Sequence, residues 1–600
     1  MSVIVNRSDL DFLLYEVEGI VSLFTAPRFA NLDRASLERM LDAAQALAED
    51  LYLSSAALLD RRPPEVVDGA VRLPSEASRA LKEFAAAGLV AQTFDESVGG
   101  LQLPYTASVA INGMFSAANQ ALFNYSMLTI AAAHLLEMWG DARQKVIYLP
   151  PMLEGRWFGT MCLSEPQAGS SLADITTRAE PASDGTYRIT GTKMWISGGE
   201  HNLAENIVHL LLAKIPGGPP GVKGISLFIV PKLRVEESGS IGEDNHVTLV
   251  GLNHKMGQRG TTNCLLNFGE HGATIGHLIG NPHEGLRYMF HMMNEARISV
   301  GHGAVTSGLV GYLYSLDYAS ERRQGRLPGH KDAASPQVAI IQHPDVRRML
   351  LSQKAAVEGG LALIFYCALL VDRKAVAAAP AEIHDLELLL QILTPIAKSW
   401  PSEHCLEANK LAIQILGGAG YTQDHPVERL YRDNRLNHIH EGSYGIQGLD
   451  LLGRKVRLED GRGLKLLFSR IGETTAALNE GELARWARQL DELVVLWRET
   501  TNACSSCPAE LLSLSNATSY LDAAGHVVVG WLWLRQAAVA HRKLHGGGEA
   551  DRKFYEGKMF ACAFFYRYVL PNAAVAFKLV RSLDDTCLSM QPEHFHAGRC

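Results

Sequence analysis

The spacing of apolar positions divides the chain into helical and strand-like stretches. Apolar residues recur at helical spacing over Leu37–Leu53, Ala77–Val90 and Ala107–Trp139, so residues 1–157 are expected to form a helical domain. Between residues 158 and 280 the apolar segments become short and rich in β-branched residues, which predicts a β domain. The predicted strands are Tyr187–Ile189, Ile207–Lys214, Ile225–Val230 and Val247–Leu252.

Helical periodicity returns after Gly285 and continues almost to the end of the chain. The predicted helices are Met289–Leu316, Val346–Asp372, Asp385–Leu411, Leu464–Leu478, Glu482–Thr500, Leu511–Ala540 and Arg552–Leu583. We assign residues 281–455 to a helical bundle and residues 456–600 to an additional C-terminal helical domain. The order of elements predicts a multidomain α+β fold with a helical N-terminal domain, a central β-barrel-like domain, a helical bundle and further C-terminal helices.

The composition is that of an ordinary globular protein. Hydrophobic residues make up 47% of the chain, and the formal net charge of −8 gives no field that would attract nucleic acid. The acidic first twenty residues argue against a targeting peptide, and the longest apolar stretch, near Val527–Leu534, is too short to span a membrane. Nine scattered cysteines indicate a reducing interior, so a cytoplasmic protein is expected, and we interpret the lone pair Cys504 and Cys507 as incidental.

The stretch 409–454 holds the first candidate for chemistry. Glu441 stands in the sequence Ile-His-Glu-Gly-Ser, and Gly442 leaves an open approach for a ligand because it has no side chain. Upstream, Gly417–Gly420 follows an apolar helical run and predicts a helix C-terminus with a permissive backbone. Taken alone, Glu441 is most simply a solvated loop carboxylate.

Two further motifs lie far upstream, in the predicted β domain. Residues 161–171 read Met-Cys-Leu-Ser-Glu-Pro-Gln-Ala-Gly-Ser-Ser, and residues 193–199 read Lys-Met-Trp-Ile-Ser-Gly-Gly. Each has a plain structural explanation. The first could be a turn in which Ser170 or Ser171 caps a short helix with Asp174 in its first turn, and the second could be a strand end with a buried tryptophan.

Together and in this order, the three motifs resemble the acyl-CoA dehydrogenase family over roughly residues 80–455. Residues 164–175 resemble its flavin-binding turn, residues 193–199 its flavin-flanking strand end, and residues 414–443 its closing signature with the catalytic glutamate. The chain length, the insertion after Arg326 and the extra helical C-terminus are most similar to the bacterial branch of about 600 residues. That branch includes 3-methylmercaptopropionyl-CoA dehydrogenase and large fatty-acyl-CoA dehydrogenases.

The resemblance implies an FAD-dependent removal of a proton from Cα and a hydride from Cβ of an acyl-CoA thioester. Glu441 would be the base that faces the α carbon, in an apolar site that raises its pKa. Ser170, Arg297 and Gly442 would lie on the substrate side. For Arg297 a structural ion pair with Glu295 or another core carboxylate is the alternative.

The resemblance also implies an FAD site that two subunits of a homodimer complete. Ser164 and Ser197 would offer hydroxyls to the flavin edge, and Trp195 an apolar wall. Arg322 and His343 would meet the diphosphate region of a neighbouring subunit's cofactor. The full set of implied cofactor positions is Met161, Leu163, Ser164, Gly169, Ser170, Trp195, Ile196, Ser197, Arg322, His343, Gln414, Gly417, Gly418, Ser443 and Gly445.

The chain departs from the family pattern near the base. His440 replaces the usual tyrosine and Gly445 also differs, which changes the expected shape of the acyl pocket. Ser164 and Ser443 replace threonines and keep the hydroxyl. His438 and His440 have no third ligand at metal spacing, so no metal site is expected. The motifs for a dinucleotide fold, a P-loop and a zinc protease are missing from the sequence.

The leading prediction is oxidation of an acyl-CoA, expected to be medium-to-long and straight, to the trans-2-enoyl-CoA in bacterial fatty-acid β-oxidation. Electron-transferring flavoprotein would be the electron acceptor. The chain-length hypothesis rests on the branch and on apolar helices around Met289–Met293 and Leu361–Leu370. The alternatives are an acyl-CoA oxidase and a dehydrogenase of a short thioether acyl-CoA such as 3-methylmercaptopropionyl-CoA, which His440 would favour. A nucleic-acid-associated relative would need a basic C-terminal face, and a silent assembly factor would not retain Glu441 and Arg297.

Overall fold

The structure, a computed structural model, describes residues 2–329, 332, 334–546 and 551–596, with the side chains of residues 290–294 outside the description. It consists of two compact units. One is Phe24–Ala296, and the other joins Met1–Leu23 to Arg297–Cys600. By this division the first 23 residues belong with the C-terminal helices.

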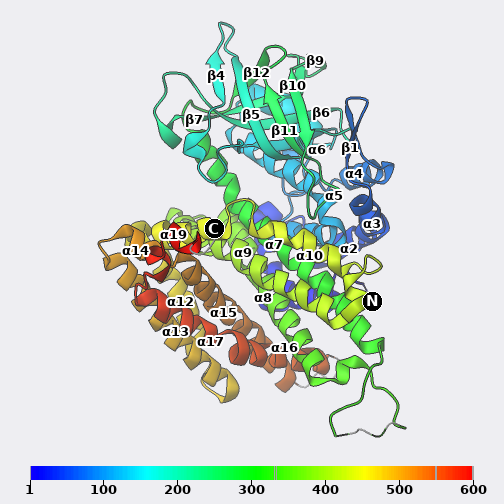
Figure 1. The fold of residues 1–600 in the computed structure, drawn as a ribbon, viewed down its shortest axis with the longest axis vertical. Coiled ribbons are helices and arrows are strands. Elements are labelled where there is room, and N and C mark those ends of the chain that lie inside the picture. Colours follow the sequence, from blue (N-terminus) through cyan, green and yellow to red (C-terminus); the bar gives the residue numbers. More distant parts are fainter. Residues whose placement is uncertain (1, 330–331, 333, 547–550, 597–600) are drawn as a thin grey trace. The chain divides into compact units, whose positions relative to one another are not determined.

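The unit Phe24–Ala296 begins with helices and a small hairpin (Figure 1). The helices are α2 (Arg34–Leu47), α3 (Ser54–Arg61), α4 (Ser75–Ala86), α5 (Tyr105–Trp139) and α6 (Ala142–Leu153), and a π-helical turn, Ala48–Leu53, joins α2 to α3. The hairpin strands are β1 (Glu65–Val67) and β2 (Ala70–Arg72). Reciprocal capping boxes at Asp33 and Asp141 start α2 and α6 by satisfying backbone N–H groups that lack helical partners.

Eight strands follow in one sheet with the order β10-β11-β5-β12-β7-β6-β3, and β4 pairs with β5 and β6. They are β3 (Trp157–Cys162), β4 (Arg178–Pro181), β5 (Tyr187–Ser197), β6 (Asn206–Lys214), β7 (Ile225–Pro231), β10 (Val247–Leu252), β11 (Asn263–Phe268) and β12 (Thr274–Leu278). Leu210 of β6 packs with α5 and α6, whereas its neighbour Leu211 packs with residues of β5, β10 and β11. The sheet thus curls around a core of its own, as the barrel-like prediction requires.

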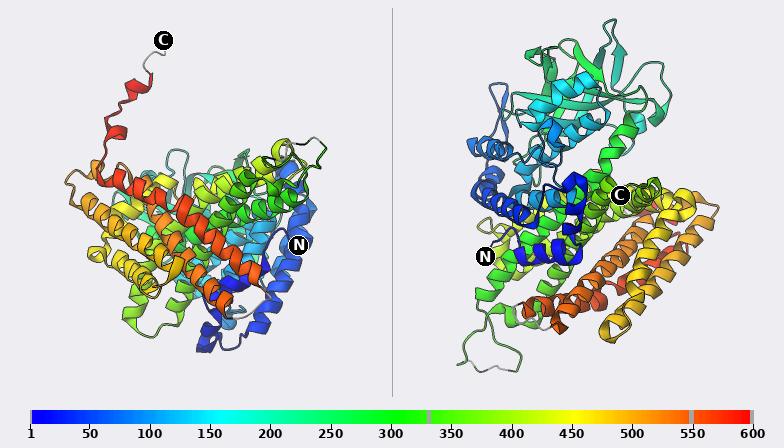
Figure 2. Two further views of the ribbon diagram at one scale, coloured as in Figure 1. Left: turned by 90° about the horizontal axis from the view of Figure 1, so that it is seen from below. Right: turned by 180° about the vertical axis from the view of Figure 1, so that it is seen from behind.

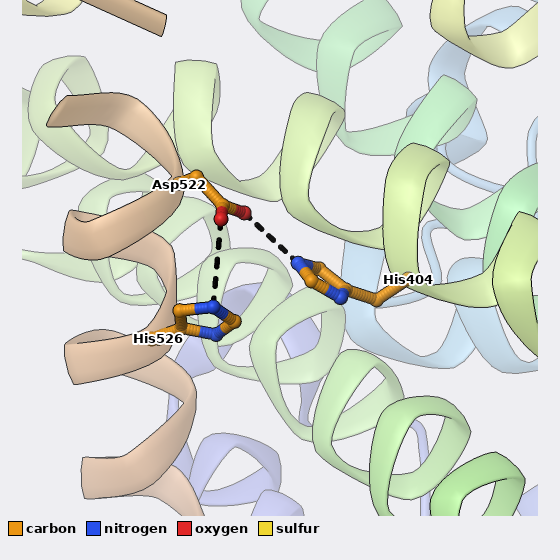
Figure 3. Close-up of side chains that lie close together, drawn as sticks. All are labelled: His404, Asp522 and His526. Atoms are coloured by element: carbon orange, nitrogen blue, oxygen red, sulfur yellow. Dashed lines mark hydrogen bonds and ion pairs between the residues drawn. The ribbon is translucent and has the colours of Figure 1, made fainter. Parts of the chain in front are cut away.

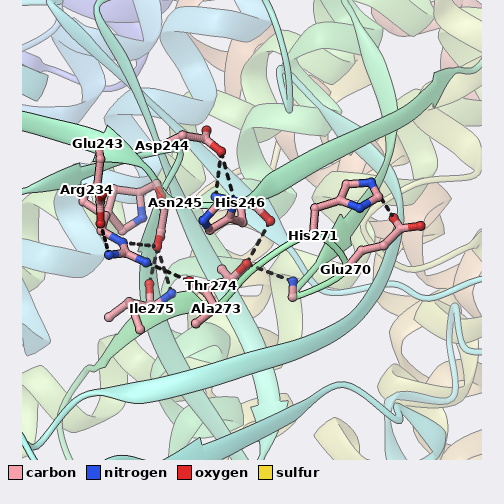
Figure 4. Close-up of polar contacts among 12 residues, drawn as sticks. Arg234, Glu243, Asp244, Asn245, His246, Glu270, His271, Ala273, Thr274 and Ile275 are labelled. Carbon is pink, nitrogen blue, oxygen red and sulfur yellow. Dashed lines mark hydrogen bonds and ion pairs between the residues drawn. The ribbon is translucent and has the colours of Figure 1, made fainter.

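A polar cluster ties the short hairpin β8 (Leu233–Val235) and β9 (Ile241–Asp244) to the sheet (Figure 4). Asn245 donates to the carbonyls of Pro231 and Ile275 at 2.8 and 2.9 Å, and its side-chain oxygen accepts from the Ile275 N–H at 2.9 Å. One buried amide therefore satisfies three backbone groups of β7 and β12, two central strands of the sheet.

The second unit is helical. Its elements are α1 (Arg7–Asp11), α7 (Gly285–Glu321, which starts in the other unit), α8 (Pro344–Val376), α9 (Pro380–Leu416), α10 (Val427–Asn434), α11 (Tyr444–Leu449), α12 (Arg462–Ala476), α13 (Gly481–Ser506), α14 (Glu510–Leu514), α15 (Ala517–His545), α16 (Arg552–Phe564), α17 (Pro571–Arg581), α18 (Thr586–Ser589) and α19 (Pro592–His596). A 3-10 turn, Arg435–His438, connects α10 to the loop that precedes α11.

Helix α15 is the buried centre of the C-terminal helices (Figure 2). It packs against α8, where Trp533 donates its indole N–H to the Ala355 carbonyl at 3.0 Å and a Cβ on Gly359 would meet the same indole nitrogen at 2.6 Å. The Leu361–Leu370 segment of α8 is buried in this core. The side chains of Met289–Met293, the other basis of the chain-length hypothesis, lie outside the described residues except for buried Met289.

Two helical segments are long and apolar enough to pass a test for membrane spans, namely Pro344–Val376 and Arg552–Arg581. The apolar window of the first is 89% buried inside the protein, as expected for a core helix, and that of the second is 44% buried. By length and composition alone these helices are weak evidence for a membrane protein.

Two predicted helices are interrupted. The predicted helix Leu511–Ala540 is divided at Ser515 and Asn516 into α14 and α15, and Arg552–Leu583 is divided by a π-helical turn, Phe565–Val569, in front of Pro571. Proline lacks the N–H that would continue the helical hydrogen bonds, so the regular ladder ends there. Cys504 and Cys507 are both free thiols.

Candidate active site

The two upstream motifs meet at one end of the β domain. The N–H of Met194, in β5, donates to the carbonyl of Ser164, which follows β3, at 3.0 Å. The ammonium group of Lys193 donates to the Leu163 carbonyl at 2.9 Å and to the Glu165 carboxylate at 3.0 Å. These contacts bring residues about thirty positions apart into one site.

Glu165 is the polar centre of this junction. It is 2% exposed and accepts hydrogen bonds from the backbone N–H groups of Thr176 and Thr177 at 2.7 and 3.0 Å, and from both threonine hydroxyls. Burial alone would raise its pKa, but the nearby Lys193 charge and these hydrogen bonds lower the pKa of Glu165 to about 2. Glu165 is therefore a fixed anion that organises the turn.

Trp195 stands next to this junction in an unusual conformation. Its φ is 66°, in the left-handed region that bulky residues avoid, and its side chain is 59% exposed. The buried tryptophan expected for a plain strand end is thus not found. The adjacent Ile196 is buried in the sheet core, so only its backbone can reach a ligand.

The serines of the two motifs are accessible. Asn263 donates to the Ser197 hydroxyl at 3.2 Å, while the Ser164 and Ser170 hydroxyls make no hydrogen bond to any other described residue. Ser171 does not cap the short helix Leu172–Asp174 but donates to the Asp174 side chain. Gly169 is exposed, and a Cβ there would meet nothing within 4 Å.

Glu441 lies in the loop Ile439–Ser443, which we call the catalytic loop, in the other unit. Both Glu441 and Gly442 have left-handed backbones, with φ of 53° and 85°. Such a conformation is costly for glutamate and persists only where neighbouring contacts hold it. A Cβ on Gly442 would also lie 2.5 Å from the side-chain nitrogen of Gln447, so glycine is required at that position.

Two side chains hold the carbonyls of this turn. The Gln447 amide donates to the Glu441 carbonyl at 3.0 Å, and the Lys398 ammonium donates to the Gly442 carbonyl at 2.8 Å. Gln447 and Lys398 are fully buried, and Lys398 comes from the middle of α9. The Glu441 N–H makes no hydrogen bond to another described residue, so it is available to a ligand.

The Glu441 carboxylate is half-buried and makes no hydrogen bond or ion pair with another described residue. Burial raises the pKa of Glu441 above its ordinary value, and the positive charges of Lys398 and Arg297 oppose this rise without cancelling it. Burial likewise lowers the pKa of Lys398 to about 8. A carboxylate with a raised pKa, two cations near it and no direct partner is suited to accept a proton.

Arg297 forms the structural ion pair that was its alternative explanation, and its partner is the core carboxylate of Asp450. Its guanidinium lies 2.9 Å from Asp450, and both side chains are almost completely buried. Glu295 instead lies 3.3 Å from His134. The Nε of Arg297 is buried without a hydrogen-bond partner among the described residues, so part of the guanidinium remains available.

The two histidines that flank Glu441 have separate environments. His438 lies 3.0 Å from Glu403 and its ring packs at a tilt against that of Tyr444, whereas His440 lies 3.3 Å from Asn437. Burial, together with the Lys398 charge, lowers the pKa of His440 to about 3, so this imidazole is neutral.

The remaining predicted cofactor positions lie at helix ends. The Arg322 carbonyl accepts from the Ile340 N–H at 2.8 Å, and His343 Nε2 lies 2.8 Å from the Gln324 carbonyl, which closes the loop after α7. Of the rest, Gln414, Gly417 and Gly418 are exposed at the end of α9, Gly445 is exposed in α11, and Ser443 is the N-cap of α11.

Comparison with known sequences decides the family. The N-terminal, middle and C-terminal domains of acyl-CoA dehydrogenase match residues 38–156, 160–270 and 283–455, and an acetyl-CoA dehydrogenase C-terminal-like domain matches residues 467–591. The 3-methylmercaptopropionyl-CoA dehydrogenase of Ruegeria pomeroyi is 34% identical over 94% of this chain and 96% of its own length. The chain belongs to the acyl-CoA dehydrogenase family.

One further relative supports this assignment, and a solved structure shares the fold. The broad-specificity linear acyl-CoA dehydrogenase FadE5 of Mycobacterium tuberculosis is 33% identical over 98% of this chain and 99% of its own length. An acyl-CoA dehydrogenase of Bacillus anthracis, solved in complex with FAD, has the same fold, with a TM-score of 0.73 and 19% identity over 96% of this chain and 93% of that chain. The present chain, as a member of this family, is an FAD-dependent oxidoreductase.

The residues at the β-domain junction fit a flavin. An exposed indole with a strained backbone offers a flat apolar face. Beside it lie the Ser164 hydroxyl, which has no hydrogen-bond partner among the described residues, and the Ser197 hydroxyl, which accepts from Asn263 and can still donate. In such a site Trp195, Ser164 and Ser197 would hold the isoalloxazine, which supplies the hydride acceptor when bound.

Sequence reasoning missed the residues that support the motifs. Lys193 and Glu165 were part of quoted motifs without a role, and Lys398, Gln447 and Asp450 were not singled out. A signal existed for Lys398, because it is the only charged residue in the otherwise apolar segment from Leu388 to Trp400. A lysine there must find a polar partner on folding.

Proposed function

We propose that this acyl-CoA dehydrogenase converts a medium-to-long, straight-chain acyl-CoA to the trans-2-enoyl-CoA, with Glu441 as the base. The observation that carries the proposal is the state of the Glu441 carboxylate, which has a raised pKa, no direct partner among the described residues and a backbone held in place from both carbonyls.

The chain's own groups divide the work at the α carbon. Glu441 takes the α proton, and its own N–H, which has no partner among the described residues, donates to the thioester oxygen and stabilises the negative charge that develops there. The positive charges of Lys398 and of Arg297, which Asp450 fixes on one side, favour the ionised form of the base because they oppose the effect of burial on its pKa. The FAD supplies the acceptor for the β hydride.

The chain-length proposal draws on the relatives. By their names, one relative is a broad-specificity enzyme for linear acyl-CoAs, and another acts on 3-methylmercaptopropionyl-CoA. The buried Leu361–Leu370 segment belongs to the helical core and supports no acyl pocket. A short thioether substrate is the second candidate, since neutral His440 stands where a tyrosine is usual.

We further propose a cytoplasmic homodimer that delivers its electrons to electron-transferring flavoprotein. The exposed positions Arg322, Gln414 and Gly417 support a second subunit that completes the cofactor site. Arg322→Ala should weaken FAD retention and the dimer together, because the two are linked by mass action. A monomer that holds FAD tightly would contradict this part of the proposal.

The deciding experiment is anaerobic bleaching of the flavin absorbance by acyl-CoAs of four to sixteen carbons and by 3-methylmercaptopropionyl-CoA. Each buried methylene adds about 0.8 kcal/mol of binding, so kcat/KM should rise with chain length up to the capacity of the pocket. A maximum at four carbons or with the thioether would reject the longer substrate. Hydrogen peroxide produced in air as fast as dye-coupled turnover would identify an oxidase instead.

A further inference from the structure

Helix α15 of the C-terminal domain touches the element that follows the catalytic loop. Gly448 of α11 lies so close to α15 that a Cβ on it would be 2.8 Å from the Ala517 carbonyl. One turn further along α15, the hydroxyl of Tyr444 donates to the Asp522 carboxylate at 3.2 Å. The C-terminal domain therefore meets α11 through both backbone and side chain.

The Asp522 carboxylate contacts side chains of α9, of α11 and of its own helix, and Figure 3 shows its contacts with His404 and His526. Besides Tyr444 of α11, Asp522 binds His404 of α9 at 2.9 Å, and it lies 3.5 Å from His526, one turn along its own helix. Burial alone would raise its pKa, but the two histidines lower the pKa of Asp522 far below its ordinary value. The carboxylate of Asp522 is therefore held in its ionised form.

His404, Asp522 and His526 could be taken for a metal site, since their ligand atoms lie within 4.8 Å of one another. The tautomer of His526 argues against it. The indole N–H of Trp400 donates to His526 Nδ1 at 3.1 Å, so Nδ1 carries the lone pair and the ring proton is on Nε2, which faces Asp522. A metal bound at Nε2 would place that proton on Nδ1, where it would face the indole N–H of Trp400, and two donors cannot form a hydrogen bond with each other.

Tyr444 is the link between this carboxylate and the base. It directly follows the catalytic loop, and its ring packs at a tilt against that of His438, which directly precedes that loop, with 4.4 Å between the ring centroids. The two ends of the loop are thus clasped by one ring pair, and Asp522 anchors that pair from α15. A loop with two left-handed residues needs such external support to keep one conformation.

We propose that Asp522 is a positioning residue through which the C-terminal domain holds Tyr444 and, through it, the Glu441 loop in reactive geometry. This role rests on Glu441 being the base. It assigns the additional domain a part in the reaction as well as in covering the bundle.

The test compares Asp522→Ala, Asp522→Asn and Tyr444→Phe by the rate constant of flavin reduction at saturating acyl-CoA, the Kd of acyl-CoA, FAD content and melting temperature. We expect Asp522→Ala and Tyr444→Phe to slow reduction about tenfold per bound FAD, with the Kd changed less than twofold. Asp522→Asn, which keeps an acceptor for the tyrosine hydroxyl, should recover part of the rate. The double variant Tyr444→Phe/Asp522→Ala should be no slower than Asp522→Ala.

The matched control is Glu499→Ala, which removes an exposed ion pair with Arg581 in the same domain and should leave the reduction rate unchanged. If Asp522→Ala does not fold, Tyr444→Phe decides, because it deletes only a hydroxyl. A wild-type rate in Tyr444→Phe, or additive losses in the double variant, overturns the proposal. A rate abolished by EDTA and restored by Zn²⁺ would make the cluster a metal site and also overturn it. Normal reduction in Glu441→Gln would reject the proposed base itself, a separate outcome.

Discussion

Two glutamates of this enzyme each have a buried lysine nearby, and their pKa values are shifted in opposite directions. In the β domain the ammonium of Lys193 contacts the Glu165 carboxylate directly at 3.0 Å, and the pKa of Glu165 is lowered to about 2. In the helical unit Lys398 contacts the carbonyl of Gly442 instead, and the pKa of Glu441 is raised. The same pair of residue types thus gives a fixed anion in one place and a proton acceptor in the other.

The difference lies in what satisfies each carboxylate. Glu165 receives four hydrogen bonds from Thr176 and Thr177 in addition to the ion pair, so protonation would break a complete network. Glu441 receives none from the described residues, and the cation nearest its loop is held one residue away on the backbone. A base needs charge nearby to stay ionised, but it must not be neutralised by direct contact.

The largest expected effect separates the two glutamates by function. Glu441→Gln should slow flavin reduction about a thousandfold or more, because the base is lost, while FAD content and melting temperature stay near wild type. Glu165→Gln should do the reverse and lower FAD content and melting temperature while each bound FAD is still reduced at a similar rate. Anaerobic stopped-flow absorbance measures the reduction rate, the flavin absorbance of the purified protein measures FAD content, and thermal unfolding measures the melting temperature. Equal losses of reduction rate in the two variants would contradict the different roles assigned to the two glutamates.

The second prediction concerns the direct ion pair. Lys193→Met should destabilise the protein by about 3–5 kcal/mol, because it leaves Glu165 buried without its cation. The double variant Lys193→Met/Glu165→Gln should recover part of that loss. Lys232→Met serves as control, since its partner Glu200 is less buried. If the single and double variants unfold at the same urea concentration, the pair is not coupled as described.

The third prediction concerns the indirect pair. Lys398→Met should slow flavin reduction about tenfold, because the Gly442 carbonyl loses its donor and the turn loosens. It should also move the acid limb of the pH–rate profile to higher pH, since the lysine charge lowers the pKa of Glu441. Lys410→Met, which removes an exposed lysine on the same helix, is the control. An acid limb that stays in place would show that the lysine acts on geometry alone.

The smallest effect is a pH dependence of stability. The folded-state pKa of Glu165, about 2, lies below its unfolded value near 4.5, so its contribution is complete above pH 4.5 and is lost as the pH falls toward 2. Between pH 7 and pH 4 the wild type should lose about 1 kcal/mol more than Glu165→Gln. Urea unfolding at the two pH values measures this difference. Equal losses of stability in the wild type and in Glu165→Gln would show that other groups cause the pH dependence.

The sequence was informative where chemistry is concentrated in short motifs. The helix and strand segments could be predicted because local periodicity carries the signal, and Glu441 and Trp195 could be singled out as candidates because their motifs resemble those of the family. The partners of these residues could not. Lys398 lies 44 positions from Gly442, and Asp450 lies 153 positions from Arg297, so their pairing depends on how the helices pack. For the same reason the break before α15 and the place of residues 1–23 were not foreseen.

The buried cluster around Lys558 has a consequence for how the protein is made. Lys558 of α16 binds Asp9 of α1, and it also binds Glu358 at 2.8 Å. The buried carboxylate of Asp9 therefore obtains its cation from a residue 549 positions later in the chain. A ribosome that adds roughly 5–20 residues per second separates the two by about half a minute to two minutes. The unit Phe24–Ala296 can fold while the chain is still growing, but the first helix must wait for nearly the last. We expect nascent chains to expose this N-terminal segment, and to offer it to chaperones, until synthesis is almost finished.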